Sequence, residues 1–239
     1  MNDGVRDLKA AADLQIWDFP LLVSESVFAN CSSLLSEDEQ QRASRFRFQR
    51  DVRRFVVARG SARSILSGYT RTPAHQLRFA YSEHGKPSLA QNEVDVRFNL
   101  SHAGDRALLG VTLGRDIGVD LEVIRHDVEH RKLAERFFSA QEHRQLSLLS
   151  PPEGLRAFYR CWTSKEAFLK AQGLGLTRSL DSFDVDLSSG PARLAATRPD
   201  PGEAERWQLL EIEAAPGYAA AAAVYGAINR LSIFRWDRE

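Results

Sequence analysis

A helix-start signal occurs twice in this chain, 103 residues apart. Ser36-x-x-Glu39 and Ser139-x-x-Glu142 both fit a capping box, in which the serine and the glutamate satisfy free N–H groups at the first turn of a helix. The same offset superimposes apolar residues of the segments that follow: Leu35 on Phe138, Phe55 on Phe158, Ala58 on Cys161 and Leu66 on Leu169. The pattern predicts a duplicated α+β unit, with a chance match as the alternative because helix-then-strand order is common. Two copies of so long a period exclude a solenoid of short repeats.

Each half is expected to place helices first and strands after them. In the first half, a helical stretch over residues 34–66, broken near residues 49–51, precedes alternating runs at residues 77–81, 94–100, 107–113 and 118–123. The second half ends in strand-like runs at residues 182–187, 207–213 and 218–224. The prediction is an α+β fold: a pseudo-twofold pair of similar subdomains, residues 1–115 and 116–239. The active site is expected in the cleft between them, where ligands usually bind.

The composition narrows the class of protein. The 32 basic and 32 acidic residues give a formal net charge of zero, which argues against a partner such as nucleic acid or an anionic membrane. Two cysteines, Cys31 and Cys161, are too few for a disulfide scaffold, and their spacing is not that of a metal site. No apolar run reaches the roughly 18 residues of a membrane span, and the acidic N-terminus lacks the apolar core of a signal peptide. We therefore expect a reduced, cytoplasmic protein.

Two acidic residues alternate in the segment Ile117-Gly-Val-Asp-Leu-Glu. Side chains repeat every two residues along a strand, so Asp120 and Glu122 are expected on one face. Two adjacent carboxylates repel each other unless a cation lies between them, and hard oxygen ligands suit Mg²⁺ or Mn²⁺. The alternative interpretation is an ordinary polar strand face, or ion pairs with nearby arginines.

A second candidate segment reads Trp162-Thr-Ser-Lys-Glu-Ala-Phe-Leu-Lys. On a helix, Glu166 and Lys170 lie one turn apart, so a surface ion pair is the simplest interpretation. Lys165 would lie about 100° around the helix from Glu166. The chain has only five lysines, and two of them fall in this segment.

Two turns carry further candidates. In Phe98-Asn-Leu-Ser-His-Ala-Gly a strand ends in a small polar turn, where Ser101, His102 and backbone N–H groups could hold a phosphate. The turn His84-Gly-Lys-Pro presents Lys86. Taken alone, each segment is more simply explained as an ordinary turn.

The segment His126-Asp-Val-Glu-His fits the H-x-x-E-H pattern of inverted zinc peptidases. A zinc hydrolase that uses His126 and His130 is therefore one hypothesis. The surrounding segment is rich in charge and offers no separate third ligand, so a solvated helix face is the preferred interpretation.

Taken in order, the motifs Phe98-Asn-Leu-Ser-His, Gly118-Val-Asp-Leu-Glu and Trp162-Thr-Ser-Lys-Glu-Ala-Phe-Leu-Lys resemble those of the 4′-phosphopantetheinyl transferase superfamily. The length resembles that of its long, surfactin-synthetase-activating type, whose members are pseudodimers of two α+β halves. The resemblance covers about residues 34–190. It implies an enzyme that transfers 4′-phosphopantetheine from coenzyme A to a serine hydroxyl of an acyl or peptidyl carrier protein. Adenosine 3′,5′-bisphosphate is released, and the reaction depends on Mg²⁺, with Mn²⁺ as a possible substitute.

The resemblance also implies roles for individual residues. Asp120, Glu122 and Glu166 match the metal-binding acids of the family, and Glu166 is also a candidate for the base. Lys165 and Lys170 match positions that face the phosphates or the reaction centre. The remaining coenzyme A contacts are expected at Lys86, Ser101, His102, Arg42, Arg54 and Arg59, although neighbouring arginines fit the N-terminal register equally well.

The resemblance implies a cytoplasmic monomer with one composite site, because at the 103-residue offset Arg63 falls where Glu166 stands. The alternative is a homologue that binds coenzyme A or carriers without catalysis; the intact acids and lysines argue against it. The carrier and its pathway, whether fatty acid, polyketide or nonribosomal peptide synthesis, stay open.

Overall fold

The computed structural model describes residues 13–91, 93–188, 190 and 192–236. Their contacts divide the chain into two compact units. The first unit contains residues 13–82, 87–114 and 229–236, and the second contains residues 83–86 and 115–228. The main break along the chain falls between residues 114 and 115. The C-terminal strand, however, belongs to the first unit, and the short loop that carries Lys86 belongs to the second.

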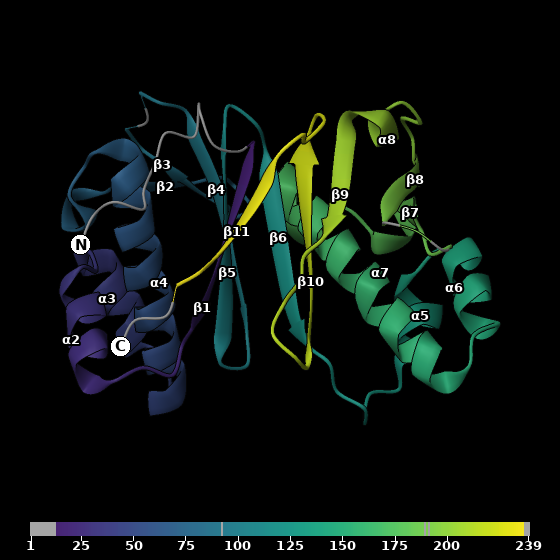
Figure 1. The fold of residues 1–239 in the computed structure, drawn as a ribbon, viewed down its shortest axis with the longest axis horizontal. Helices are drawn as coiled ribbons and strands as arrows, with labels where there is room; N and C mark the ends of the chain where they lie inside the picture. The colour runs from purple at the N-terminus through teal and green to yellow at the C-terminus, as the bar shows by residue number, and fades with distance from the viewer. Residues whose placement is uncertain (1–12, 92, 189, 191, 237–239) are drawn as a thin grey trace. The chain divides into compact units, whose positions relative to one another are not determined.

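The first unit packs helices against a four-stranded sheet (Figure 1). Its helices are α2 (Glu25–Ser33), α3 (Glu37–Ser44) and α4 (Gln49–Thr70), followed by a 3-10 turn at Ala74–Gln76. The sheet has the order β11-β1-β5-β4, from strands β1 (Leu14–Pro20), β4 (Val96–Ala103), β5 (Arg106–Leu113) and β11 (Leu231–Arg235). Strands β2 (Phe79–Tyr81) and β3 (Pro87–Leu89) form a separate hairpin pair. Apolar residues of α4 and of this sheet make the core of the unit.

The pairing of β1 with β11 joins segments from opposite ends of the chain. The two strands run parallel, with Leu14 opposite Leu231 and Asp18 opposite Arg235. The ring of Trp17 stacks on that of Phe234 with their centroids 4.5 Å apart. This strand pair was not among the sequence-based expectations.

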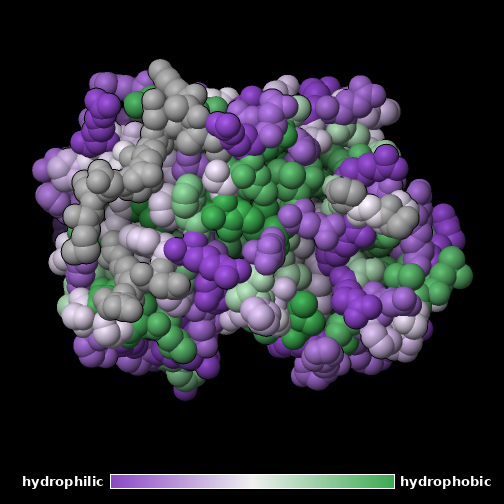
Figure 2. All heavy atoms as spheres, viewed as in Figure 1, coloured by the Kyte–Doolittle hydropathy of each residue, from purple (hydrophilic) through white to green (hydrophobic). Residues whose placement is uncertain are grey.

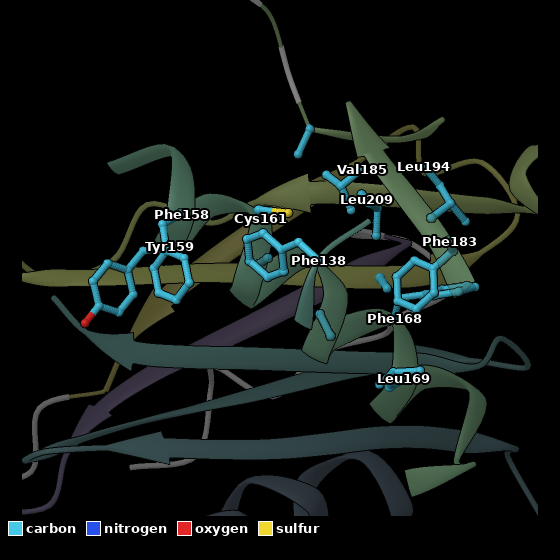
Figure 3. Close-up of a cluster of buried hydrophobic side chains, with 14 of the residues drawn as sticks. Phe138, Phe158, Tyr159, Cys161, Phe168, Leu169, Phe183, Val185, Leu194 and Leu209 are labelled. Carbon is cyan, nitrogen blue, oxygen red and sulfur yellow. The ribbon is translucent and has the colours of Figure 1, made fainter. Parts of the chain in front are cut away.

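The second unit combines a three-stranded sheet with a long helix. The sheet has the order β6-β10-β9, from β6 (Ile117–Val123), β9 (Trp207–Glu211) and β10 (Tyr218–Tyr225), all antiparallel. The helices are α5 (His130–Phe137), α6 (Ala140–Ser147), α7 (Pro151–Gln172) and α8 (Glu203–Arg206), with 3-10 turns at Gly175–Thr177 and Leu180–Ser182. Strands β7 (Phe183–Asp186) and β8 (Arg193–Thr197) pair separately. Aromatic side chains, among them Phe138, Phe158, Phe168 and Phe183, form the core around α7 (Figure 3).

Corresponding helices in the two units match in length and spacing. Helices α3 and α6 both have eight residues and begin after the two predicted capping boxes, which are both formed. Helices α4 and α7 both have 22 residues. These correspondences are what a duplication predicts.

Each capping-box glutamate also pairs with a basic residue of the following long helix. Glu39 is buried and accepts from Arg59 and Arg63, with N–O distances of 2.6 Å in both cases. Glu142 is buried and pairs with Lys165 at 2.8 Å. One carboxylate therefore fixes the start of a short helix and ties it to the long helix, in both units.

Within the described ranges, no helix is long and apolar enough to cross a membrane. Hydrophilic residues are spread widely over the face shown in Figure 2.

Candidate active site

Strand β6 presents the acidic pair to helix α7. Gly118, Asp120 and Glu122 share one face of β6, because side chains alternate along a strand. A Cβ atom at Gly118 would lie 2.0 Å from the carbonyl oxygen of Ala167 and 2.3 Å from the backbone nitrogen of Ala171. Only glycine therefore lets the backbone of α7 approach β6 so closely, directly beside the two carboxylates.

Helix α7 is well delimited at both ends. Ser150 and Glu153 form a capping box at its start, and Gly173 ends it in the left-handed conformation with φ 69°. One face carries the aromatic core residues of Figure 3. Glu166 and Lys170 are partly buried residues one turn apart on this helix.

The two elements meet in an ion pair. Lys170 Nζ lies 2.5 Å from Asp120 Oδ1; the lysine side chain is 32% exposed and the aspartate side chain 4%. Lys170 also acts electrostatically on Glu122 and Glu166. The structure thus brings together four predicted site residues: the three acids and Lys170.

The environment of Glu122 and Glu166 disfavours the charged forms of these two side chains. Burial raises the pKa of Glu122, with a further increase from Asp120, while Lys170 and a hydrogen bond from Trp162 act in the opposite direction. Burial also raises the pKa of Glu166, again with a contribution from Asp120. Like charges in a partly buried site are stabilised by a bound cation, and an all-oxygen donor set suits Mg²⁺ or Mn²⁺. The donor chemistry therefore fits the implied metal.

Asp120 acts electrostatically on Glu122 and Glu166, but the three carboxylates are not arranged as a metal coordination sphere. Among the residues the structure describes, no group of three or more His, Cys, Asp or Glu side chains is placed to hold a metal ion. His126, Glu129 and His130, which form the zinc-peptidase sequence pattern, are among these described residues and do not form a metal-binding cluster. The ring of His130 packs instead near Phe158, with centroids 6.1 Å apart.

Lys86 comes from the loop at residues 83–86 and contacts the C-terminal end of helix α7. Its Nζ donates to the carbonyl oxygen of Ala171 at 2.6 Å, next in sequence to Lys170. Its aliphatic chain runs past Gly173, where an added Cβ would lie 3.1 Å from Lys86 Cδ. The loop at residues 83–86 is therefore part of the second unit, beside the segment that carries the candidate site.

Lys165 has a different environment from the one the motif predicts. It is fully buried, and its ammonium group donates to Glu142 Oε1 at 2.8 Å, Leu180 O at 2.7 Å and Phe183 O at 2.6 Å. An ammonium group has three N–H donors, and these three acceptors use all of them. All three donors of Lys165 are thus engaged within the protein, which favours a structural role, and the predicted catalytic or phosphate-binding role stays a prediction.

In the first unit, Arg42 lines a cavity of about 660 Å³. The other lining residues include Arg45, Phe46 and Tyr81, which together offer cationic and aromatic groups. Arg45 is one of the neighbouring arginines that fit the N-terminal register, and Tyr81, which lies on β2, was not among the predicted residues.

The other predicted N-terminal arginines are engaged within the protein. Arg54 donates two hydrogen bonds to Asp105, and the buried Arg59 donates to Glu39 and to Tyr81. Ser101 and His102 lie on β4, where Ser101 is buried and His102 is exposed. Only Arg42 of the three arginines faces the cavity described above.

Comparisons with known proteins give the family. A family model described as the 4′-phosphopantetheinyl transferase superfamily matches residues 116–223, and one described as its N-terminal region matches residues 23–112. The chain is 38% identical to the 4′-phosphopantetheinyl transferase HetI of Nostoc sp. over 90% of this chain and 88% of that protein. It is 34% identical to a putative 4′-phosphopantetheinyl transferase of Synechocystis sp., over 82% and 78% of the two chains. It is 30% identical to the 4′-phosphopantetheinyl transferase Sfp of Bacillus subtilis, over 79% and 81%. The chain therefore belongs to the 4′-phosphopantetheinyl transferase superfamily.

Proposed function

We propose that this transferase moves 4′-phosphopantetheine from coenzyme A to a serine hydroxyl of an acyl or peptidyl carrier protein, with Mg²⁺ as its metal. The observation that carries the proposal is the convergence of three carboxylates and one lysine where β6 meets α7. The serine oxygen attacks the phosphorus that bears the pantetheine. The bond from that phosphorus to the bridging oxygen breaks, and adenosine 3′,5′-bisphosphate leaves.

Asp120, Glu122 and Glu166 would hold the metal, which, when bound, neutralises the diphosphate and the charge that grows on the leaving phosphate. Lys170 supplies a cation on the same side of α7 and contacts the diphosphate. Glu166 is in addition the proposed acceptor of the serine proton, directly or through a water molecule. The raised pKa of this carboxylate supports the role, because a base needs affinity for the proton.

The cavity around Arg42 is the proposed binding place of the adenine and the 3′-phosphate. Arginine suits a phosphate group because its planar donors bind two oxygens at once, and the rings of Phe46 and Tyr81 offer surfaces for a base. Lys86, Ser101 and His102 stay proposed contacts of the phosphates. A cytoplasmic monomer that binds neither membranes nor nucleic acid stays a prediction.

The direct test is intact-mass spectrometry of several apo carrier proteins after incubation with the chain, coenzyme A and Mg²⁺. We expect a gain of one phosphopantetheine group on at least one carrier, and no gain when the acceptor serine of that carrier is replaced by alanine. Binding of coenzyme A without modification of any carrier would instead support the non-catalytic alternative.

The stabilising effect of Mg²⁺ is expected to depend on pH. In the metal-free protein, the pKa values of Glu122 and Glu166 are raised, so the folded state holds protons that the unfolded state has released. The free energy of unfolding without metal therefore falls as the pH rises from the ordinary carboxyl value through these raised values. Metal binding needs the ionised groups, so the Mg²⁺-induced increase in Tm should be larger at about pH 7.5 than at about pH 5.

Thermal unfolding with and without Mg²⁺ at the two pH values measures this difference. Asp127→Asn, at an exposed position outside the cluster, should show the same Mg²⁺ effect as wild type. An equal increase in Tm at both pH values would contradict the assignment of these carboxylates to the metal.

A further inference from the structure

We propose that Lys170 is a resident counter-cation that competes with a divalent metal for Asp120, so that metal binding and diphosphate binding are coupled through this side chain. The inference rests on the proposed function, because it takes Asp120, Glu122 and Glu166 as the metal ligands. The proposed function gives Lys170 a contact with the diphosphate. The new element is that Lys170 and the metal compete for Asp120.

The contact that carries the inference is short and specific. Lys170 Nζ lies 2.5 Å from Asp120 Oδ1, and it is the cation that acts on both Glu122 and Glu166. An ammonium group at this distance occupies space on the carboxylate that a metal ligated by the same oxygen would need. Two cations on one carboxylate also repel each other.

Because Asp120 is buried, replacement of the lysine by another cation is more favourable than simple departure of the lysine. The side chain of Asp120 is 4% exposed, so bulk water solvates its charge poorly. Loss of a counter-ion from a buried carboxylate is costly, so the arrival of another cation favours departure of the ammonium group.

Lys170 approaches Asp120 from the solvent side of the site. Its side chain is 32% exposed and ends a flexible four-carbon stem on α7. A diphosphate beside the metal offers the displaced ammonium group a new anionic partner. A ligand that draws the lysine away from Asp120 thereby raises the affinity for metal, and by linkage the metal raises the affinity for that ligand by the same factor.

Mn²⁺ binding, followed by electron paramagnetic resonance of the free ion without any carrier protein, tests the competition. Lys170→Met should bind Mn²⁺ at least about fivefold more tightly than wild type when coenzyme A is absent. Lys170→Arg keeps the charge and should stay close to wild type. Coenzyme A should tighten Mn²⁺ binding by a larger factor in wild type than in Lys170→Met.

Lys132→Met is the matched control, because Lys132 is an exposed lysine of the same unit that pairs with Glu129. It should leave the Mn²⁺ affinity unchanged. Circular dichroism verifies folding, and Lys170→Gln, which keeps a neutral donor to Asp120, replaces Lys170→Met if that variant unfolds.

The outcomes separate this inference from the proposed function. Equal Mn²⁺ affinities for wild type and Lys170→Met would overturn the competition and leave the transfer reaction standing. Absence of Mn²⁺ binding by all variants would overturn the metal assignment, and with it both proposals. Tighter binding by Lys170→Met in a protein that modifies no carrier would support the competition and count against the transfer reaction.

Discussion

Replacement of Glu166 by glutamine is expected to lower the rate of phosphopantetheine transfer by about 10²–10³-fold without disturbing the fold. Glutamine has the shape of glutamate, and the side chain is only partly buried, so packing is retained. The charge is lost, and with it one proposed metal ligand and the proposed proton acceptor. Single-turnover mass spectrometry of an apo carrier measures the rate, and Mn²⁺ binding measures the metal affinity, which should fall in parallel.

The same variant should not be less stable than wild type in the absence of metal. Asp120 contributes to the raised pKa of Glu166, so removal of the charge at position 166 relieves a repulsion. A loss of activity together with an unchanged or higher Tm therefore separates a functional role from a structural one. Glu205→Gln, at an exposed position on α8, is the matched control and should keep full activity. Retention of more than about a tenth of the wild-type rate by Glu166→Gln would contradict the assignment.

The candidate site was predictable where its signal is local. The alternation of Asp120 and Glu122 within one strand is formed, because the side-chain period of a strand is two. Both capping boxes are formed for the same reason: each needs only four consecutive residues. The fold class was predictable as well, since α+β follows from the order of these local signals, and the structure confirms it.

Features that depend on distant parts of the chain were not predictable. The parallel pairing of β1 with β11 joins residues near 14 to residues near 231, and nothing in either segment indicates its partner. Tyr81 reaches the cavity of Arg42 from a separate strand, which helix-based reasoning did not consider. The placement of Lys86 in the second unit depends on its contact with Ala171, 85 residues further along the chain.

The buried environment of Lys165 has a local cause. The family motif places it beside Glu166, and neighbours on a helix point about 100° apart, so only one of the two can face β6. Lys165 falls on the apolar stripe that includes Cys161, Phe168 and Leu169. A polar residue on such a stripe needs a buried partner. For Lys165 that partner is Glu142. Glu142 occupies the capping box that is equivalent to the box of Glu39 in the first unit.

Replacement of Lys165 by methionine is therefore expected to cost about 3–5 kcal/mol in the free energy of unfolding. Methionine fills much of the same volume, but it leaves Glu142, which is fully buried, without its counter-ion. Glu142 also accepts from the backbone N–H groups of Ser139 at 2.9 Å and Val185 at 2.7 Å, so an unpaired charge there weakens the junction of α6, α7 and β7. Denaturant unfolding, followed by circular dichroism and tryptophan fluorescence, measures the loss, with the exposed Lys132→Met expected to show no measurable change.

The double variant Glu142→Gln with Lys165→Met decides between a structural and a phosphate-binding lysine. If Lys165 exists to neutralise Glu142, removal of both charges should be less destabilising than removal of the lysine alone, because the glutamine oxygen still accepts backbone hydrogen bonds. The folded double variant should then bind coenzyme A with nearly wild-type affinity, since none of the three Lys165 donors is available to a ligand. A phosphate-binding lysine predicts the opposite pair of results: little loss of stability from Lys165→Met, and a weakened affinity for coenzyme A that Glu142→Gln does not restore.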